Sequence, residues 1–154
     1  MRGLATIGEC MIELSEHPDG RITRAFGGDT LNTAVYLARL GMPVDYITAL
    51  GDDPWSDEML SAWQAEGVGT GSVIRSKGRL PGLYIIQTDA RGERRFSYWR
   101  DRAPARDLFA LPETAPPLRA PRFWSSASGL VRSYGGWRWH MVWECSLDLS
   151  DRGT

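Results

Sequence analysis

The sequence predicts an α/β fold built on a parallel sheet, because strand-like and helix-like patterns alternate along the chain. The apolar run "LATIG" at residues 4–8 suits a buried strand, and residues 30–40 carry apolar side chains at helical spacing. A second strand pattern at 44–51 and a second helix pattern at 53–68 follow. Such alternation is typical of a parallel sheet with right-handed crossovers. With 154 residues and 42% hydrophobic content, the chain is long enough for one domain with a core.

The first helix follows a polar strand and a glycine pair. "RITRAFGG" at 21–28 predicts that strand. Within 30–40, Leu31, Ala34 and Ala38 share one helical face, and a glycine stands just after the last turn. The spacing therefore predicts an amphipathic helix whose first turn directly follows the glycines.

The second helix, over 53–68, has Pro54 in its first turn and Gly67 at its end. The acids of "GDD" at 51–53 precede it, and aspartate is a preferred N-cap residue. We therefore expect these acids to start and cap the helix and not to bind a metal.

The pattern changes beyond the second helix. Two β-rich runs within 72–100 are joined by the turn "DARGE", which predicts a hairpin on a small sheet apart from the main one. Residues 112–121, "PETAPPLRAP", form a proline-rich connector. Residues 122–154 hold four of the seven tryptophans and show neither a helical nor a strand period, so we expect an atypical tail there.

Composition excludes several classes of partner and site. The net charge of −1 disfavours nucleic acid and anionic membranes, and the N-terminus lacks an apolar run suited to a signal peptide, so we expect a cytoplasmic protein. Cys10 and Cys145 are far apart and indicate neither a disulfide framework nor a zinc site. His140 and Glu144 stand four residues apart, but the chain has only one other histidine, so we expect no metal site.

The stretch "FGGDTLNTAVYLARLG" at 26–41 is the strongest candidate for a ligand site. A helix N-terminus offers unpaired N–H groups, and preceding glycines let a ligand approach the backbone. Gly27, Gly28 and Asp29 could thus form a polar cradle to which Asn32 contributes one turn later. The alternative is a glycine turn in which Asp29 simply caps the helix.

Several blocks of sequence, in this order, carry a resemblance to a known family. The blocks are "IGECMIELSE", "FGGDTLNTAVYLARLG", "TALGDDPWSDEML", "AEGV", "PGLYIIQTD" and "GERRFSYWR". Together they resemble the N-terminal half of ribokinase-like (PfkB) sugar kinases and, among these, 2-keto-3-deoxygluconate kinases. The resemblance implies a doubly wound α/β sheet with a small β lid. Residues 1–111 would form part of that domain, with lid strands at about 12–27 and 72–100.

The resemblance also implies which residues bind the sugar acid. Tyr84 would come from the lid, and Tyr98 with Arg100 would close over the substrate. The full set of expected substrate-binding residues is Gly28, Asp29, Asn32, Tyr84, Tyr98 and Arg100. An arginine can meet a carboxylate in fork geometry, whereas a neutral sugar offers it no such partner. Glu13, in "MIEL", is a weaker candidate at a position where the family often keeps an acid.

Intact members of this family use ATP and magnesium, and they supply the phosphate site from their C-terminal half. The Gly-Ala-Gly-Asp type motif that holds the base and the anion hole is absent here, as is an Asn-x-x-Glu motif. We therefore expect no catalytic residue and no nucleotide or metal site in this chain, and no activity from it alone. Our hypothesis for residues 122–154 is translation out of the ancestral reading frame; the alternative is a divergent tail with a new role.

Two further alternatives stay open at this stage. The lineage could be another ribokinase-like enzyme, of the fructokinase or ribokinase type. The chain could also be a non-catalytic remnant that binds a sugar or forms a homodimer through its lid strands, whose apolar runs suit pairing between subunits.

Overall fold

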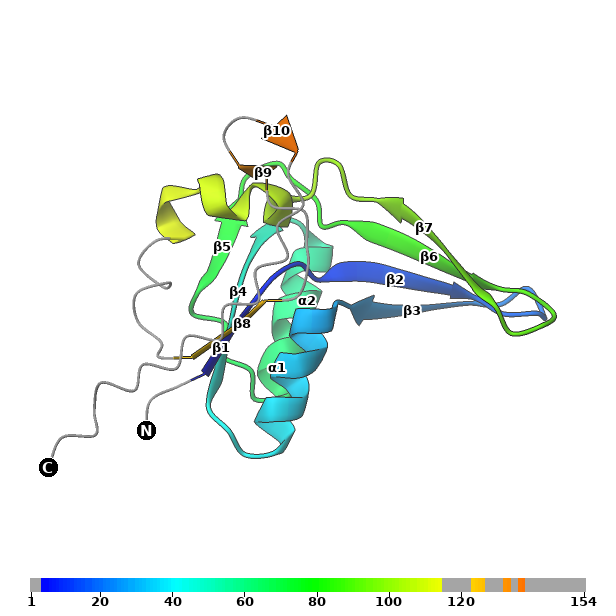
Figure 1. Cartoon of the computed structure of the whole chain (residues 1–154), viewed down its shortest axis with the longest axis horizontal. Coiled ribbons are helices and arrows are strands. Elements are labelled where there is room, and N and C mark those ends of the chain that lie inside the picture. Colours follow the sequence, from blue (N-terminus) through cyan, green and yellow to red (C-terminus); the bar gives the residue numbers. More distant parts are fainter. Residues whose placement is uncertain (1–3, 115–122, 127–131, 134–135, 138–154) are drawn as a thin grey trace, which may run out of the picture.

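The computed structural model describes residues 4–114, 123–126, 132–133 and 136–137, and it contains a parallel four-stranded main sheet (Figure 1). The strand order is β5-β4-β1-β8. The strands are β1 (Leu4–Ile7), β4 (Val44–Gly51), β5 (Val73–Ser76) and β8 (Phe123–Ser126). Two helices, α1 (Asp29–Arg39) and α2 (Pro54–Ala65), pack on this sheet. The α/β prediction is confirmed, with both helices within a few residues of their expected bounds.

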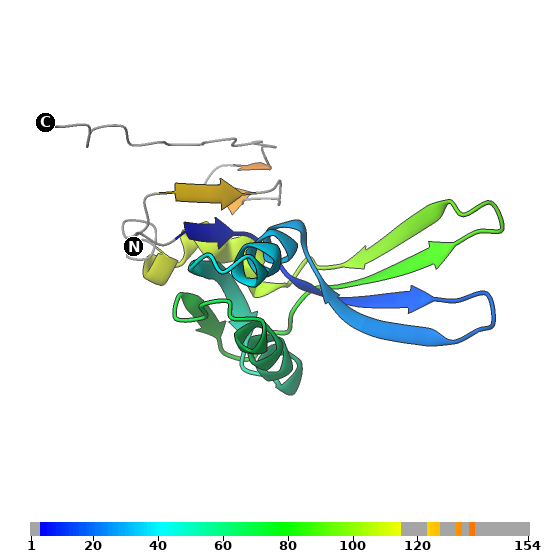
Figure 2. The same ribbon diagram turned by 90° about the horizontal axis from the view of Figure 1, so that it is seen from below.

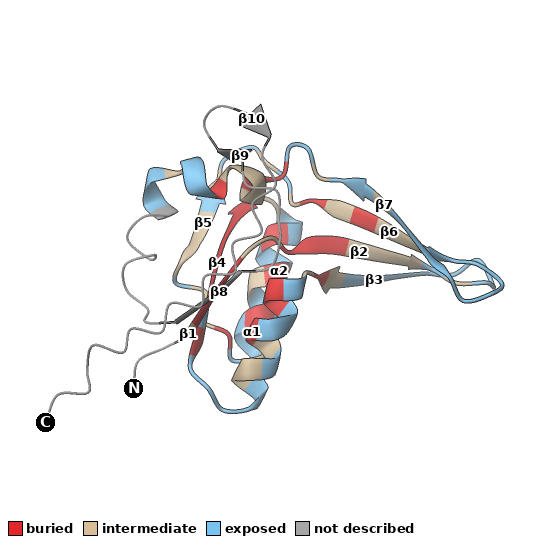
Figure 3. Ribbon diagram, viewed as in Figure 1, coloured by how far each residue is buried: buried red, intermediate tan, exposed pale blue. Residues whose placement is uncertain are grey.

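The central strand β4 shows why the chain forms a layered core. Alternate side chains of a strand point to opposite faces, so Val44, Tyr46 and Leu50 pack against the helices. Ile47 and Ala49 point the other way, into a second apolar cluster. Figure 3 shows this strand buried over most of its length. The main sheet is therefore covered on both faces, as a parallel sheet requires.

The second apolar cluster is closed by short 3-10 helices instead of a long α-helix. Leu108, in η1 (Pro104–Ala110), packs there with residues of β1 and β4. A further 3-10 turn, η2 (Pro112–Thr114), follows directly. None of the helices in the described part of the chain has the length and apolar character needed to span a membrane.

The helix ends follow the sequence signals. Asp53 caps α2, because its Oδ1 accepts hydrogen bonds from the backbone N–H groups of Trp55 at 3.0 Å and Ser56 at 3.2 Å. This confirms the expected capping role for Asp53, whereas Asp52 accepts a hydrogen bond from the N–H of Gly78 at 2.8 Å. After α1, Gly41 has a φ of 77°, in the left-handed region that glycine adopts without strain, and its N–H donates to the carbonyl of Ala38.

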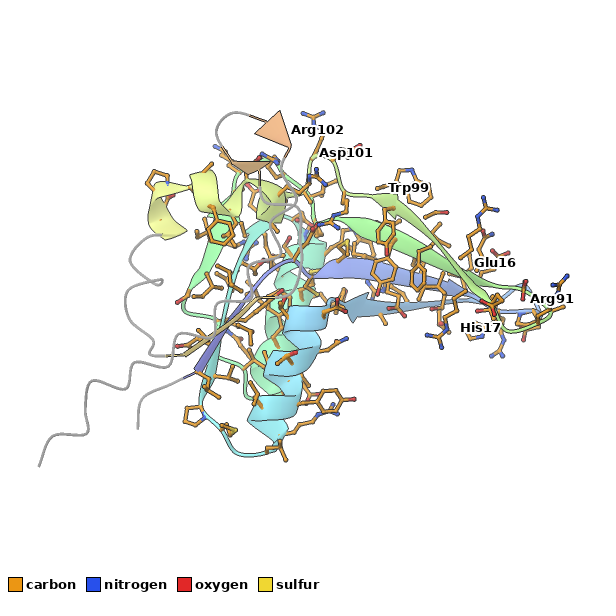
Figure 4. The ribbon with its side chains drawn as sticks, in the orientation of Figure 1. Glu16, His17, Arg91, Trp99, Asp101 and Arg102 are labelled. Atoms are coloured by element: carbon orange, nitrogen blue, oxygen red, sulfur yellow. The ribbon has the colours of Figure 1, made fainter. Side chains whose placement is uncertain are left out.

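A second, mixed sheet forms the lid and projects from one end of the main sheet as two hairpins (Figure 2). Its order is β3-β2-β6-β7, with β2 and β6 parallel and the two outer pairs antiparallel. The strands are β2 (Met11–Glu16), β3 (Ile22–Gly27), β6 (Leu83–Thr88) and β7 (Arg94–Trp99). Figure 4 shows Glu16, His17 and Arg91 at the far tip of the lid, away from the main sheet.

The structure corrects two expectations about strands. Val73–Ser76 was expected in the lid, but it pairs with β4 in the main sheet, because a strand that follows α2 can return beside β4 as a β-α-β unit. No parallel strand was expected after residue 122, yet Phe123–Ser126 pairs in parallel with β1. The sequence did not indicate this strand because four residues are too few to show a period. The strand forms there because the edge of β1 offers backbone hydrogen-bond partners.

The remaining expectations for the C-terminal region fall mainly outside the described residues. Two short strands, β9 (Arg132–Ser133) and β10 (Gly136–Trp137), pair in antiparallel fashion. The proposed out-of-frame origin of residues 122–154 and the expectation for His140 and Glu144 lie beyond what the structure describes. Most of the connector at 112–121 is likewise outside it.

Candidate functional site

The floor of the site is the N-terminus of α1. Gly28 occupies the N-cap position and the helix begins at Asp29, with no side-chain capping hydrogen bond. The interpretation of Asp29 as a helix cap is therefore wrong, and its carboxylate is exposed at the first turn. Asn32 lies one turn later and is also exposed, with its backbone N–H bonded to the carbonyl of Gly28 at 2.8 Å.

Gly28 lets the helix approach the loop that follows β1. A Cβ added there would lie 3.2 Å from Cys10 Cα and 3.3 Å from the carbonyl carbon of Glu9, and it would overlap the carbonyl oxygen of Glu9. The absence of a side chain at Gly28 thus brings Glu9 and the start of α1 to the same place. Thr30, buried in the first helical turn, fixes that end from below through a 3.2 Å hydrogen bond with the Tyr46 hydroxyl.

The lid supplies an aromatic wall. Tyr84 on β6 lies opposite Tyr98 on β7, with ring centroids 5.7 Å apart, and Phe96 lies 6.2 Å from Tyr84 by the same measure. The Tyr84 hydroxyl donates a hydrogen bond to Glu13 Oε2 on β2. Burial and this bond raise the pKa of Tyr84, so its hydroxyl stays protonated; its one proton is donated to Glu13, and its oxygen remains free to accept. Glu13 therefore acts on the wall by orienting Tyr84.

An ion pair joins the floor to the lid. Arg100, which follows β7, donates from Nη2 to Glu9 Oε2, and the side chains are 23% and 7% exposed. Burial raises the pKa of Glu9, while the attraction of Arg100 and then of Arg106 opposes this effect. Two buried atoms of the pair, Glu9 Oε1 and Arg100 Nε, have no hydrogen-bond partner. The pair thus retains unused polar groups.

These elements enclose a pocket of about 330 Å³ between the N-terminus of α1 and the lid. All six residues predicted from the sequence line it: Gly28, Asp29, Asn32, Tyr84, Tyr98 and Arg100. Four lining residues were not predicted: Glu9, Met11, Thr30 and Phe96. The signal for Glu9 was its position directly after the first strand, since ligands of open α/β sheets gather at the carboxyl ends of strands.

The chemistry of the pocket suits a small polyhydroxylated molecule with one carboxylate. Asp29 accepts hydrogen bonds, and Asn32 and the Tyr98 hydroxyl both donate and accept, whereas the Tyr84 hydroxyl, which donates to Glu13, can only accept. Arg100 is the only basic residue among the described residues that line the pocket, and a guanidinium meets a carboxylate with two parallel hydrogen bonds. The volume is at the small end of ligand pockets, which suits a metabolite of sugar size.

The chain belongs to the pfkB family of carbohydrate kinases, whose sequence model matches residues 1–122. Among curated relatives, the 2-dehydro-3-deoxygluconokinase of Dickeya dadantii (strain 3937) is 53% identical over 116 residues, which cover 73% of this chain and 37% of that protein. The 2-dehydro-3-deoxygluconokinase of Escherichia coli (strain K12) is 54% identical over 107 residues, which cover 67% of this chain and 34% of that protein. A fructokinase of Klebsiella pneumoniae is 31% identical over 114 residues, which cover 74% of this chain and 36% of that protein.

Solved structures show the same fold. The fructokinase from Xylella fastidiosa matches with a TM-score of 0.72 and 25% identity, over 82% of this chain and 41% of that one. The same enzyme with bound ATP gives a TM-score of 0.71 at 26% identity, over 82% of this chain and 39% of that one. The 2-dehydro-3-deoxygluconokinase from Thermotoga maritima gives 0.71 at 24% identity, over 82% and 41%, respectively. The family prediction and the ribokinase-like fold are confirmed.

The chain spans only part of these relatives. It covers 34–38% of the length of the four curated 2-dehydro-3-deoxygluconokinases that it matches.

Proposed function

We propose that this chain forms the sugar-acid-binding part of a kinase for 2-keto-3-deoxygluconate, which is also called 2-dehydro-3-deoxygluconate. The observation that carries this proposal is the position of Arg100. Among the described lining residues it is the single base, and the others include groups that can bind hydroxyls at Asp29, Asn32 and two tyrosines. The substrate carboxylate would lie against the guanidinium, and the sugar hydroxyls would lie over the N-terminus of α1.

The pocket does not fit the phosphate donor. Among the described residues that line the pocket Arg100 is the one base, and the proposed sugar-acid carboxylate uses the donors that this base has left, so none remains for a triphosphate. Within the proposal, ATP and the base for phosphoryl transfer belong to parts of the kinase other than this pocket, and we expect no turnover from the chain alone.

Replacement of Arg100 by lysine tests the proposal while it keeps the positive charge. Hydrogen bonds to charged groups contribute about 1.5–3 kcal/mol, and loss of the planar fork removes part of this, so we expect the Kd for 2-keto-3-deoxygluconate to rise about tenfold. The Kd for D-fructose should change less than twofold, because this neutral ketose has no carboxylate to pair with Arg100. Isothermal titration calorimetry measures both constants.

A matched control is Arg79→Lys. Arg79 is also partly buried and donates to Asp107 at 3.1 Å and to the carbonyl of Arg102 at 2.8 Å, but it lies outside the pocket. The Arg79→Lys substitution should therefore leave the affinities for both sugars unchanged. Equal weakening of the acid and of fructose in Arg100→Lys would contradict the proposed substrate class.

The second candidate is a fructokinase-type sugar site. It is supported by curated fructokinases at 30–31% identity and by solved fructokinases among the structural neighbours. A neutral ketose gives Arg100 no carboxylate partner, so this candidate predicts that fructose binds at least as tightly as the sugar acid. The same titrations therefore separate the two candidates.

We further propose that a second copy of the chain covers part of the lid. Ile22 on β3 and Trp99 on β7 lie outside the pocket lining and are 64% and 58% exposed, and large apolar side chains exposed on the lid suit contact with a second copy. Size-exclusion chromatography with light scattering is the test. A monodisperse dimer supports the pairing, whereas a monodisperse monomer at high concentration contradicts it.

A further inference from the structure

The pocket contains an acid where an anion is expected to bind. Glu9 lies at the carboxyl end of β1 and Arg100 at the end of β7, 91 residues later, yet the two side chains are in direct contact. Glu9 already takes one donor of the guanidinium. An anionic ligand must therefore use the donors that Glu9 leaves, or compete with Glu9 for them.

This ion pair differs from the others in the described part of the chain. Its two side chains are 7% and 23% exposed, whereas the side chains of the other pairs seen there are all at least 32% exposed. Exposed pairs contribute little to structure, because solvent screens them and their side chains stay mobile. An enclosed pair is screened less by solvent, and removal of one partner leaves the other charge buried and uncompensated.

The surrounding chain is shaped to fit the pair. A Cβ added to Gly82, just before β6, would lie 2.7 Å from Glu9 Oε1, 2.9 Å from Met11 Cγ and 3.1 Å from Arg100 Cβ. Gly82 thus leaves the space that the Glu9 carboxylate and the Arg100 stem occupy. On the other side, the carbonyl of Glu9 is packed against Gly28 at the start of α1. The acid is held between the helix and the lid.

The hydrogen-bond inventory shows what the pair leaves free. A guanidinium has five N–H donors in a rigid plane. Glu9 binds the Nη2 group, and the buried Nε–H of Arg100 has no protein partner. Glu9 thus restrains the guanidinium through Nη2, and because Arg100 lines the pocket, donors that Glu9 does not use remain for a second acceptor there.

We propose that Glu9 is a positioning residue that holds Arg100 so that the remaining donors of its guanidinium face a ligand carboxylate, which sets the preference for a sugar acid over a neutral sugar. This inference rests on the proposed function for the identity of the ligand. It adds a residue that itself need not touch the ligand. Without Glu9, Arg100 must be ordered when the ligand binds, and that ordering lowers affinity for the acid alone.

Three variants test the role of Glu9 by calorimetry with 2-keto-3-deoxygluconate and D-fructose. Glu9→Ala removes the anchor, and we expect the Kd of the acid to rise about threefold to tenfold. Glu9→Gln keeps one acceptor oxygen for Arg100 and should restore part of that loss. Asp107→Asn removes the acid of the Arg79–Asp107 pair outside the pocket and should change neither affinity.

The test depends on the ratio of the two affinities, because a purely structural role of Glu9 would weaken the binding of both ligands together. Selective loss of the acid in Glu9→Ala, partly restored in Glu9→Gln, supports the proposal. Equal weakening of the acid and fructose, or an unchanged affinity for the acid, overturns it. Circular dichroism shows whether each variant is folded; if Glu9→Ala is not, the ratio in Glu9→Gln decides by the same criteria.

A second measurement does not depend on the ligand. In nitrogen-15 NMR spectra of the ligand-free chain, the Nε–H of Arg100 should exchange slowly with water, and it should exchange faster in Glu9→Ala but not in Asp107→Asn. Equal exchange in all three proteins overturns the positioning role. If the unmodified chain binds neither sugar while this NMR difference is present, the proposed function fails and the hold of Glu9 on Arg100 stands.

Discussion

Gly28→Ala tests the packing that forms the floor of the pocket. The φ of Gly28 is 170°, which is extended backbone that any residue adopts, so the substitution acts through steric overlap alone. The new Cβ would lie 3.2 Å from Cys10 Cα and would overlap the Glu9 carbonyl oxygen. Non-bonded carbon atoms prefer separations of about 3.5–4.0 Å, so the loop after β1 must move away from α1.

The expected cost follows from this overlap. Insertion of one carbon into a well-packed site typically costs about 1–3 kcal/mol, because backbone must shift. For a chain of this size each kcal/mol lowers Tm by about 2–4 °C, so we expect a fall of about 2–12 °C. The moved loop carries Glu9, so the affinity for the sugar acid should fall in the same variant. Thermal unfolding followed by circular dichroism measures the first effect, and calorimetry measures the second.

Gly71→Ala is the matched control. A Cβ at Gly71 would meet nothing within 4 Å, and this glycine has no positive φ. Its effect should stay within about 0.5 kcal/mol. Equal Tm values for Gly28→Ala and Gly71→Ala would refute the argument that close approach of Glu9 to the helix defines the floor.

Two further predictions concern the helix cap and the charge of Glu9. Asp53→Ala should lower the free energy of unfolding by about 1 kcal/mol, because α2 loses its N-cap. Asp29→Ala should cost less, because α1 has no side-chain cap. Urea unfolding of both variants measures the two losses, and equal losses would contradict this prediction. Burial raises the folded-state pKa of Glu9 above its ordinary value of 4.5, so folding favours its protonated form. The stability of the unmodified chain relative to Glu9→Gln should therefore decline as pH rises through and above that value. Thermal unfolding of both proteins between about pH 4 and pH 8 measures the difference in their stabilities at each pH. A difference that stays constant, or that changes in favour of the unmodified chain as the pH rises, would be inconsistent with a raised pKa.

Local signals were sufficient to predict most of the main domain. The helix from Asp29 to Arg39 was predicted because apolar spacing and a following glycine are properties of the segment itself. The same holds for α2, where Asp53 and Pro54 mark the start. The choice of partner for Val73–Ser76 was missed because strand pairing is decided by the fold as a whole, and four residues carry no signal for it.

The site was predicted in part for a similar reason. The six residues expected from the resemblance could be predicted because they belong to recognisable blocks of sequence. In the structure they line one pocket. The contact between Glu9 and Arg100 could not be predicted, because the two residues are 91 positions apart and no local sequence pattern relates them. The space that Gly82 leaves for them likewise exists only in three dimensions.

The central claim is that the pocket between α1 and the lid binds a sugar acid, and direct titration of the unmodified 154-residue chain tests it. Calorimetry with 2-keto-3-deoxygluconate and with D-fructose under identical conditions gives the two dissociation constants. We predict that the acid binds at least about tenfold more tightly, the margin expected for its carboxylate on Arg100. Equal affinities, or tighter binding of fructose, would contradict the claim.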